Sequence, residues 1–310
     1  MVIAGQRGGK STFLGGVATK IKQAQRSRAT GLNSLRDIFN FSTDDLVGNY
    51  QVSYGDEDEF EKEVVDRMRS TYEYPQATDQ RDTYIVEFNL NAGQDISKTI
   101  TVAAMDIPGE AQERAVQTLL SGDVDRYEVR EKYHTDGVDP RRGAIKNRIE
   151  DSKSINNKEW KWAFMYHYLR SNRVIFMYNL HKIIHIDDID PIIDPDLLHK
   201  VDNDDKTAVL LFTAADVLDY DPTNFNISLL SRGGINKRYF DNDLVNEIDT
   251  QLAGSKGDEI LDIVKCAKDC NMDLFSIAVP EQQRKEIKHS QGKIVLEGFD
   301  NIGRWLKNTT

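Results

Sequence analysis

Residues 4–11 read Ala4-Gly5-Gln6-Arg7-Gly8-Gly9-Lys10-Ser11, a short glycine-rich segment that ends in Lys-Ser. Two apolar residues, Val2 and Ile3, precede it, and residues 12–14 begin a helical pattern that continues to about Arg26. This order of strand, loop and helix is the context in which the pattern (A/G)-x-x-x-x-G-K-(S/T) binds phosphate. The segment therefore predicts a phosphate-binding loop at the start of an α/β domain.

Each residue type in this loop suits the binding of a nucleoside triphosphate. The glycines let successive backbone N–H groups turn toward the β-phosphate, and the helix N-terminus adds partial positive charge. Lys10 would reach the β- and γ-phosphates, and the Ser11 hydroxyl is suited to Mg²⁺. We expect the nucleotide to contact Ala4, Gly5, Gln6, Arg7, Gly8, Gly9, Lys10, Ser11 and Thr12.

The composition describes an acidic chain of 310 residues with a formal net charge of −11 and 39% hydrophobic residues. This charge argues against a nucleic acid as the main partner, because binding phosphates requires an excess of Lys and Arg on some face. The longest apolar stretch, residues 174–186, is broken by polar residues and is too short to span a bilayer. The first strand begins at the N-terminus, which leaves no room for a signal peptide. We expect a soluble cytoplasmic protein without a transmembrane segment.

The rest of the chain alternates strands with helices. Strand character is found at residues 83–90, 99–105, 174–178, 208–212 and 273–279. A turn at residues 91–95 predicts that the first two of these strands form a hairpin. The pattern predicts one α/β domain over residues 1–310, with a mostly parallel sheet and helices on both faces. The segments at about 27–73, 121–170 and 184–206 are expected to be elaborations of that domain.

A second motif follows the strand at residues 99–105, where the chain reads Asp106-Ile107-Pro108-Gly109-Glu110. A strand ending in Asp-x-x-Gly suits a γ-phosphate sensor, since the Asp lies near Mg²⁺ and the Gly N–H can bond the γ-phosphate. Glu110 would then orient or polarise the attacking water, and Gln112, two residues further along the chain, is the alternative for this role. We expect Lys10, Glu110 and Gln112 to act in catalysis.

With these two motifs the chain resembles the phosphate-loop GTPases of the Ras-like and translation-factor class. It is most similar to the divergent prokaryotic and archaeal GTPase-like domains whose sensor reads D-x-P-G-E. The resemblance implies a three-layer P-loop NTPase fold and a Mg²⁺ ion held by Ser11, Asp106 and a switch-loop threonine. Thr78 is the nearest threonine for that role, with Thr30 and Thr43 as rivals, and Thr78 could instead cap a turn.

The same resemblance implies guanine recognition by Asn-Lys-x-Asp after a buried strand. At that position the chain reads Thr213-Ala214-Ala215-Asp216, which keeps the Asp but replaces the Lys by Ala214. A last family motif, Ser-Ala-Lys or a relative, would correspond to Ser276-Ile277-Ala278. Thr213, Asp216, Ser276 and Ala278 are therefore expected around the base, with Gly109 at the γ-phosphate. GTP is favoured as the ligand, and ATP stays open because the Lys is missing.

Three other groups of residues receive plain structural interpretations. His181 and His185 leave a strand and are expected in a polar loop with Asp187, Asp188 and Asp190, instead of forming a metal site. The aromatic run Trp160, Trp162, Phe164 and Tyr166 is expected to form core packing. Cys266 and Cys270 are expected to be ordinary reduced cysteines, because no His or Cys lies at zinc-binding spacing in the sequence.

These patterns predict a Mg²⁺-dependent nucleoside triphosphatase that acts as a GTPase-like switch toward an unidentified protein partner. One alternative is an ATPase motor or assembly NTPase, possibly of viral origin. That class needs an apolar strand that ends in Asp-Glu, and none of the predicted buried strands ends in this pair. The other alternative is a nucleotide-binding scaffold with impaired turnover, suggested by Glu110 and Ala214.

Overall fold

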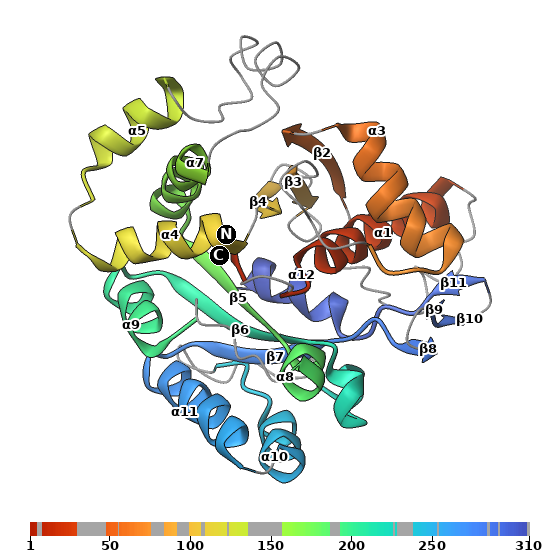
Figure 1. Ribbon diagram of the computed structural model, residues 1–310. Coiled ribbons are helices and arrows are strands. Elements are labelled where there is room, and N and C mark those ends of the chain that lie inside the picture. The colour runs from red at the N-terminus through yellow and green to blue at the C-terminus, as the bar shows by residue number, and fades with distance from the viewer. Residues whose placement is uncertain are drawn as a thin grey trace.

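Figure 1 shows the computed structural model. It describes residues 1–4, 8–29, 48–54, 56–75, 84–91, 99–106, 109–122, 124–135, 157–186, 193–225, 227, 238–252, 254–283, 286–290 and 292–308. Within these residues the protein is a mixed α/β fold whose central parallel sheet is flanked by helices.

The central sheet has four parallel strands in the order β1-β5-β6-β7. The strands are β1 (Val2–Ile3), β5 (Arg173–Asn179), β6 (Thr207–Thr213) and β7 (Asp273–Ile277). Nearly every residue of β5, β6 and β7 is buried, as the unbroken apolar runs in these segments predict. Because the strands run in one direction, their carboxyl ends meet at one edge of the sheet.

A second, antiparallel sheet lies next to β1. Its strands are β2 (Gly48–Tyr54), β3 (Tyr84–Asn91) and β4 (Thr99–Asp106), in the order β2-β3-β4. The expected pairing of β3 with β4 is confirmed, and β4 lies beside β1. Strand β2 was not predicted from the sequence, because its segment is short and mostly polar. Alternation of Tyr50, Val52 and Tyr54 is the one pattern that would have indicated it.

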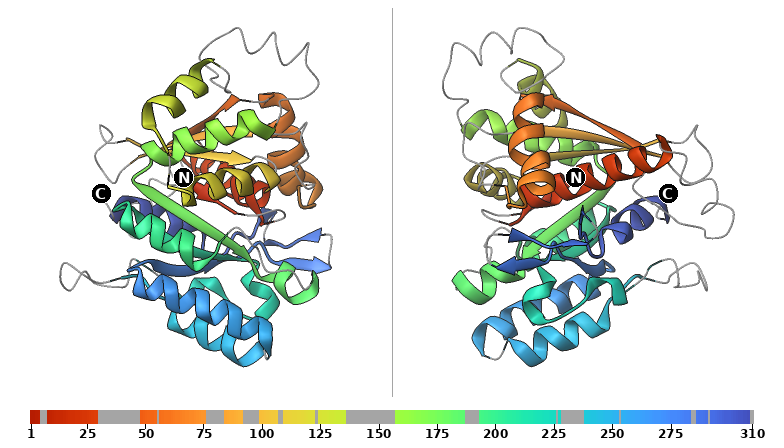
Figure 2. Two further views of the ribbon diagram at one scale, coloured as in Figure 1. Left: turned by 60° about the vertical axis from the view of Figure 1, so that its left-hand side comes forward. Right: turned by 90° about the vertical axis from the view of Figure 1, so that its right-hand side faces the viewer.

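Helices cover both faces of the central sheet and build two hydrophobic cores (Figures 1 and 2). Alternate residues of β5 point to opposite cores, so that Phe176 joins one and Met177 the other. The first core contains residues of α4 (Gly109–Leu120), α5 (Arg126–Thr135), α7 (Asn157–Arg170), α9 (Pro195–Asn203), α10 (Asn242–Gln251) and α11 (Ser255–Asp269). The second contains residues of α1 (Lys10–Ala29), η1 (Phe60–Thr71) and α12 (Phe299–Asn308).

The remaining described elements are short. They are α3 (Glu57–Glu59), which continues into the π-helical η1, then α8 (Leu180–Ile186), η2 (Ala215–Leu218), η3 (Pro222–Asn224), β8 (Glu281–Gln283), β9 (Glu286–Ile287), β10 (His289–Ser290) and β11 (Lys293–Ile294). The last four strands form two small antiparallel ribbons. Among the described helices, none has the length and apolar character that crossing a membrane requires.

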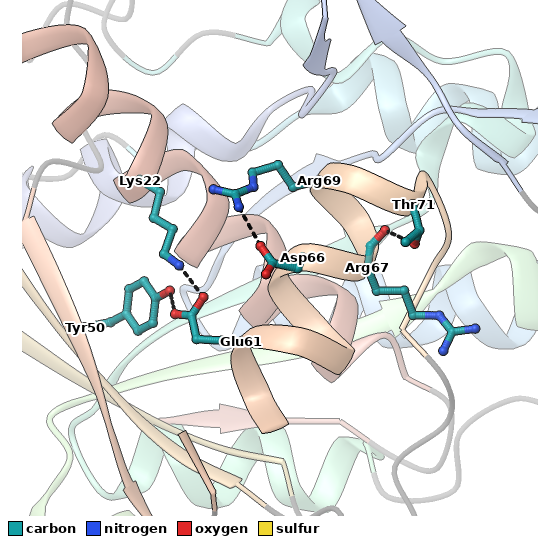
Figure 3. Close-up of polar contacts among 7 residues, drawn as sticks. All are labelled: Lys22, Tyr50, Glu61, Asp66, Arg67, Arg69 and Thr71. Atoms are coloured by element: carbon teal, nitrogen blue, oxygen red, sulfur yellow. Dashed lines mark hydrogen bonds and ion pairs between the residues drawn. The ribbon is translucent and has the colours of Figure 1, made fainter. Parts of the chain in front are cut away.

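A set of polar contacts joins α1, η1 and β2 (Figure 3). Glu61 of η1 pairs with Lys22 of α1 and accepts a hydrogen bond from the Tyr50 hydroxyl of β2. Burial raises the pKa of Tyr50, and its bond to Glu61 raises that pKa further, so the phenol stays protonated and donates. Within η1, Arg69 pairs with Asp66 at 2.6 Å. The two contacts of Glu61 thus join η1 to α1 and to the antiparallel sheet.

The segments expected as elaborations contain parts of the first core. Trp160 and Phe164 of α7 are buried in it, as are Leu197 and Leu198 of α9. Tyr166 is partly buried against the same core and stacks on Tyr133 with ring centroids 3.9 Å apart. The expectation that the aromatic run forms packing is thus confirmed, and α7 and α9 share the core of β5 and β6.

Helix α12 is tied to the central sheet by buried hydrogen bonds. The Trp305 indole N–H donates to Asp273 at 2.7 Å, and the Tyr239 backbone N–H donates to the other oxygen of that carboxylate. Arg173 donates to the Leu306 carbonyl at 2.6 Å. At its other end, the Phe299 ring lies so close to α1 that a Cβ atom at Gly16 would overlap it. These contacts fix where the Phe299 ring lies.

Candidate functional site

The predicted phosphate loop leaves the end of β1 and enters α1. Its described residues are Ala4, Gly8 and Gly9, while Gly5, Gln6 and Arg7 lie outside the described part of the chain. Gly9 has φ +85°, a left-handed conformation that glycine adopts without steric cost. The Phe13 N–H donates to the Gly9 carbonyl at 2.8 Å, which closes the first turn of α1. The expected sequence of strand, loop and helix is therefore present.

Lys10 lies across the base of this loop. Its side chain is 7% exposed, and its ammonium group donates to the Ala4 carbonyl at 3.2 Å. A lysine in this position is held among backbone groups at the N-terminus of a helix, where anions are favoured. Ser11 and Thr12 follow in the first turn of α1 and are half-buried.

Gln112 has a different position from the one expected of a residue that orients water. Its side chain is fully buried in α4, and its Oε1 accepts a hydrogen bond from the Ala4 N–H at 3.2 Å. Its Oε1 is thus engaged at the base of the loop, whereas its buried Nε2 has no hydrogen-bond partner among the described residues. The contact also places the start of α4, with Gly109 as its first residue and Glu110 as its second, beside the base of the loop.

A cavity of about 250 Å³ lies between the loop and the carboxyl ends of β5, β6 and β7. The loop and α1 contribute Gly9, Thr12 and Phe13 to its wall. The carboxyl edge of a parallel sheet is where open α/β folds bind ligands, especially where the strand order reverses. Strand β1 is the edge strand of the sheet, where it pairs with β5 and lies close to β4 of the second sheet.

The end of β6 closes against the loop. A Cβ atom at Gly9 would lie 3.2 Å from the Thr213 hydroxyl oxygen, and that hydroxyl donates to the Tyr178 carbonyl at 3.3 Å. Ala214 then adopts a left-handed conformation with φ 57°, which turns the chain into η2. Asp216 in η2 lines the cavity together with Thr213 and Ala214.

The charge of the site differs between its two ends. Lys10 and the N-terminus of α1 make the loop end positive. At the other end lies Asp216, near Glu297. Burial raises the pKa of Glu297, and the carboxylates of Asp221 and Asp216 raise it further. A ligand with an anionic end and a hydrogen-bond-donating end would match this arrangement.

The two residues expected after the last strand behave differently from each other. Ser276 is 1% exposed within β7 and does not line the cavity, unlike the placement that its motif position predicted. Ala278 does line the cavity. Its backbone N–H, however, donates to the Glu297 carbonyl at 3.0 Å, and the Glu297 N–H donates back at 2.9 Å. The backbone N–H of Ala278 is therefore bonded to Glu297 and is not available to a ligand in the cavity.

Several cavity residues were missed by sequence reasoning. Asn179, at the end of β5, could have been found as the first polar residue after a buried strand. Tyr74 and Phe299 come from distant segments, and no local pattern connects them with the loop. The Tyr74 hydroxyl donates to the Val279 carbonyl. Phe299 stacks on Phe13 with ring centroids 6.5 Å apart, which gives the cavity an aromatic wall.

His181 and His185 require a correction, because residues 180–186 form helix α8 and not a polar loop. Their rings lie 4.5 Å apart on one face of that helix, and His181 lines the cavity. Asp187, Asp188 and Asp190 fall outside the described residues.

The predicted Mg²⁺ ligands are only partly described. Asp106 is the last residue of β4. Thr78, and its rivals Thr30 and Thr43, lie outside the described residues. Ser11 lies next to Lys10 in the first turn of α1.

Comparison of the chain with protein-family models, with curated proteins and with solved structures gave no significant match. The functional argument therefore rests on the residues of the site.

The close approach of Gly9 to Thr213 can be tested with a matched pair of glycines. Gly9→Ala and Gly122→Ala place a Cβ at nearly the same positive φ, +85° and +84°, but a Cβ at Gly122 meets nothing within 4 Å. Left-handed strain should destabilise both variants by about 1 kcal/mol. Gly9→Ala should lower the free energy of unfolding more than Gly122→Ala does, because Thr213 must also move to make room for the Cβ atom. Chemical denaturation measures both free energies of unfolding, and equal losses would contradict the described contact.

Proposed function

We propose that this chain is a Mg²⁺-dependent P-loop nucleoside triphosphatase that acts as a GTPase-like switch. The observation that carries the proposal is a cavity whose wall includes both Gly9, the loop residue before Lys10, and Asp216 of η2. A nucleoside triphosphate has the required polarity, with negative charge at the phosphates and hydrogen-bond donors on the base.

The phosphate end is supported by the geometry of residues 8–12. Gly8 and Gly9 precede the first turn of α1, and the positive end of a helix dipole favours an anion at this place. Lys10 reaches the loop carbonyl of Ala4 and would exchange that contact for phosphate oxygens. In the proposed complex these groups stabilise negative charge on the β- and γ-phosphates.

The base end favours guanine over adenine. Guanine presents an N1–H and an N2 amino group side by side, and a carboxylate such as Asp216 can accept both. Adenine presents one amino group beside an acceptor nitrogen, which a carboxylate repels. The aromatic wall of Phe13 and Phe299 provides an apolar surface for either base. The replacement of the family Lys by Ala214 removes one contact along the ring, so affinity for the base rests on Asp216.

The proposed ligands of a magnesium ion are Ser11, Asp106 and Thr78, whose hydroxyl and carboxylate oxygens are donors that Mg²⁺ prefers; Thr78 lies outside the described residues. When bound, Mg²⁺ would neutralise part of the negative charge on the β- and γ-phosphates. Glu110, in the first turn of α4, would orient the water that attacks the γ-phosphorus. The bond from the γ-phosphorus to the bridging oxygen then breaks, which yields the diphosphate and inorganic phosphate.

A second candidate is a nucleotide-binding scaffold with little turnover. The observation that favours it is the hydrogen bond between Gln112 and Ala4, which removes one of the two groups proposed to orient water. The remaining group, Glu110, is a carboxylate and would be repelled by the γ-phosphate. Binding without hydrolysis is the result that would select this alternative.

The phosphate end is tested by Lys10→Ala, with the exposed Lys62→Ala as control. Loss of the charge-assisted bonds should weaken Mg²⁺–triphosphate binding by about 10- to 100-fold, measured by titration with fluorescent nucleotides. Phosphate release, followed in the same samples, should also fall. Unchanged affinity in Lys10→Ala would refute the proposed phosphate site.

The base end is tested by Asp216→Asn, with Asp219→Asn as a matched control on an exposed residue that does not line the cavity. The Asn side chain has the same shape but presents an amino group to the base donors. Affinity for GTP should fall by about 10- to 100-fold while affinity for ATP changes less. A wild type that prefers ATP, with no effect of Asp216→Asn, would exclude guanine.

A further inference from the structure

Two helices that pack in the first core, α9 and α11, bring together three side chains that can bind a metal ion. His199 belongs to α9, whereas Cys266 and Cys270 lie one turn apart at the end of α11. The His199 Nδ1 atom is 3.2 Å from the Cys270 sulfur, and its Nε2 atom is 3.7 Å from the Cys266 sulfur. One ligand atom from each residue lies within 4.8 Å of the others. Sequence spacing concealed this group, because 67 positions separate His199 from Cys266.

The two separations involve different ring nitrogens, of which one would bind the ion, so the common measure of the cluster is the 4.8 Å limit on its ligand atoms, which a small side-chain rotation would bring to the spacing of a tetrahedral zinc site. Zinc bonds of about 2.3 Å to sulfur and 2.0 Å to nitrogen place neighbouring ligand atoms about 3.5 to 3.8 Å apart. The two sulfurs are contributed by positions i and i+4 of one helix, so both face the neighbouring α9. His199 is exposed, which gives an ion a path from solvent. Both cysteines are free thiols.

The surroundings of the cluster are acidic. Asp194 and Asp196 act on the Cys266 thiol, and Asp202 and Asp269 act on the Cys270 thiol. Burial is the main cause that raises the pKa of both thiols, that of Cys270 to about 12; the neighbouring Cys266 raises the Cys270 pKa further, and the carboxylates add to the rise at both thiols. A divalent cation would instead favour the thiolate form of both cysteines, because it displaces the thiol protons and compensates the nearby negative charge.

We propose that His199, Cys266 and Cys270 bind a thiophilic divalent cation, Zn²⁺ above all, with water or a neighbouring carboxylate as the fourth ligand. The ion would join α9 to α11, which lie side by side below the sheet in Figure 1. Cys270 lies just before the first residue of β7, whereas the cavity lies at the far ends of the strands. The site is therefore structural and independent of the proposed nucleotide function.

The test is a titration of the full chain with Co²⁺ under reducing conditions, followed by displacement with Zn²⁺. Wild type should bind one Co²⁺ per chain with an intense thiolate-to-cobalt charge-transfer band, which Zn²⁺ abolishes. Cys266→Ser, Cys270→Ser and His199→Ala should each weaken binding by about 10- to 100-fold or more. His185→Ala, which removes an exposed histidine outside the cluster, should bind as wild type does.

A second measurement needs no variant and therefore does not depend on whether the variants fold. Stoichiometric Zn²⁺ should protect both cysteines of wild type from alkylation and raise its thermal unfolding midpoint. Absence of a charge-transfer band, or alkylation at an unchanged rate in the presence of Zn²⁺, would overturn the proposal. Binding that persists in a Cys266→Ser/Cys270→Ser variant with an unchanged circular dichroism spectrum would overturn it as well.

Discussion

A Cβ atom at Gly9 would lie 3.2 Å from the Thr213 hydroxyl, and this close approach is the contact on which the cavity depends. It brings the loop after β1 against the end of β6, two strands away in the sheet. The parallel direction of β1, β5 and β6 makes the approach possible, because all three strands end at the same edge. Gln112 holds the loop from the other side through the Ala4 N–H. Ala4 and Gly9, on either side of residues 5–7, are thus held against α4 and β6, and the cavity lies beside Gly9.

The two ends of this cavity carry opposite charge for reasons that are local. Lys10 and the start of α1 follow from the loop itself, whereas Asp216 is presented by the left-handed turn at Ala214. Glu297 adds a second carboxylate nearby, and its raised pKa reflects burial and repulsion in that region. Such a field selects a ligand by its polarity before any specific contact is made. This is why the proposed ligand is a nucleoside triphosphate with its donor-rich base away from Lys10.

The strands and the loop could be predicted from the sequence because their causes are local. Unbroken apolar runs mark β5, β6 and β7, and the glycine-rich run before Lys10 marks the loop. The placements that local patterns did not indicate depend on distant partners. Gln112 was assigned to catalysis although its oxygen bonds Ala4, 108 positions away. Ser276 matched a motif by position, but its side chain faces the core. Tyr74, Phe299 and the neighbours of His199 become visible only when the folded chain brings separate helices and strands together.

The central claim is that one ligand spans the cavity from Lys10 to Asp216. A crystal structure of the chain with Mg²⁺ and a non-hydrolysable GTP analogue tests it most directly. The account predicts phosphate oxygens bonded to the backbone N–H groups of residues 8–11 and to the Lys10 ammonium. It also predicts the guanine against Phe13 or Phe299, with its N1–H and N2 amino group toward Asp216. A nucleotide bound elsewhere, or an empty cavity at saturating analogue, would contradict the account.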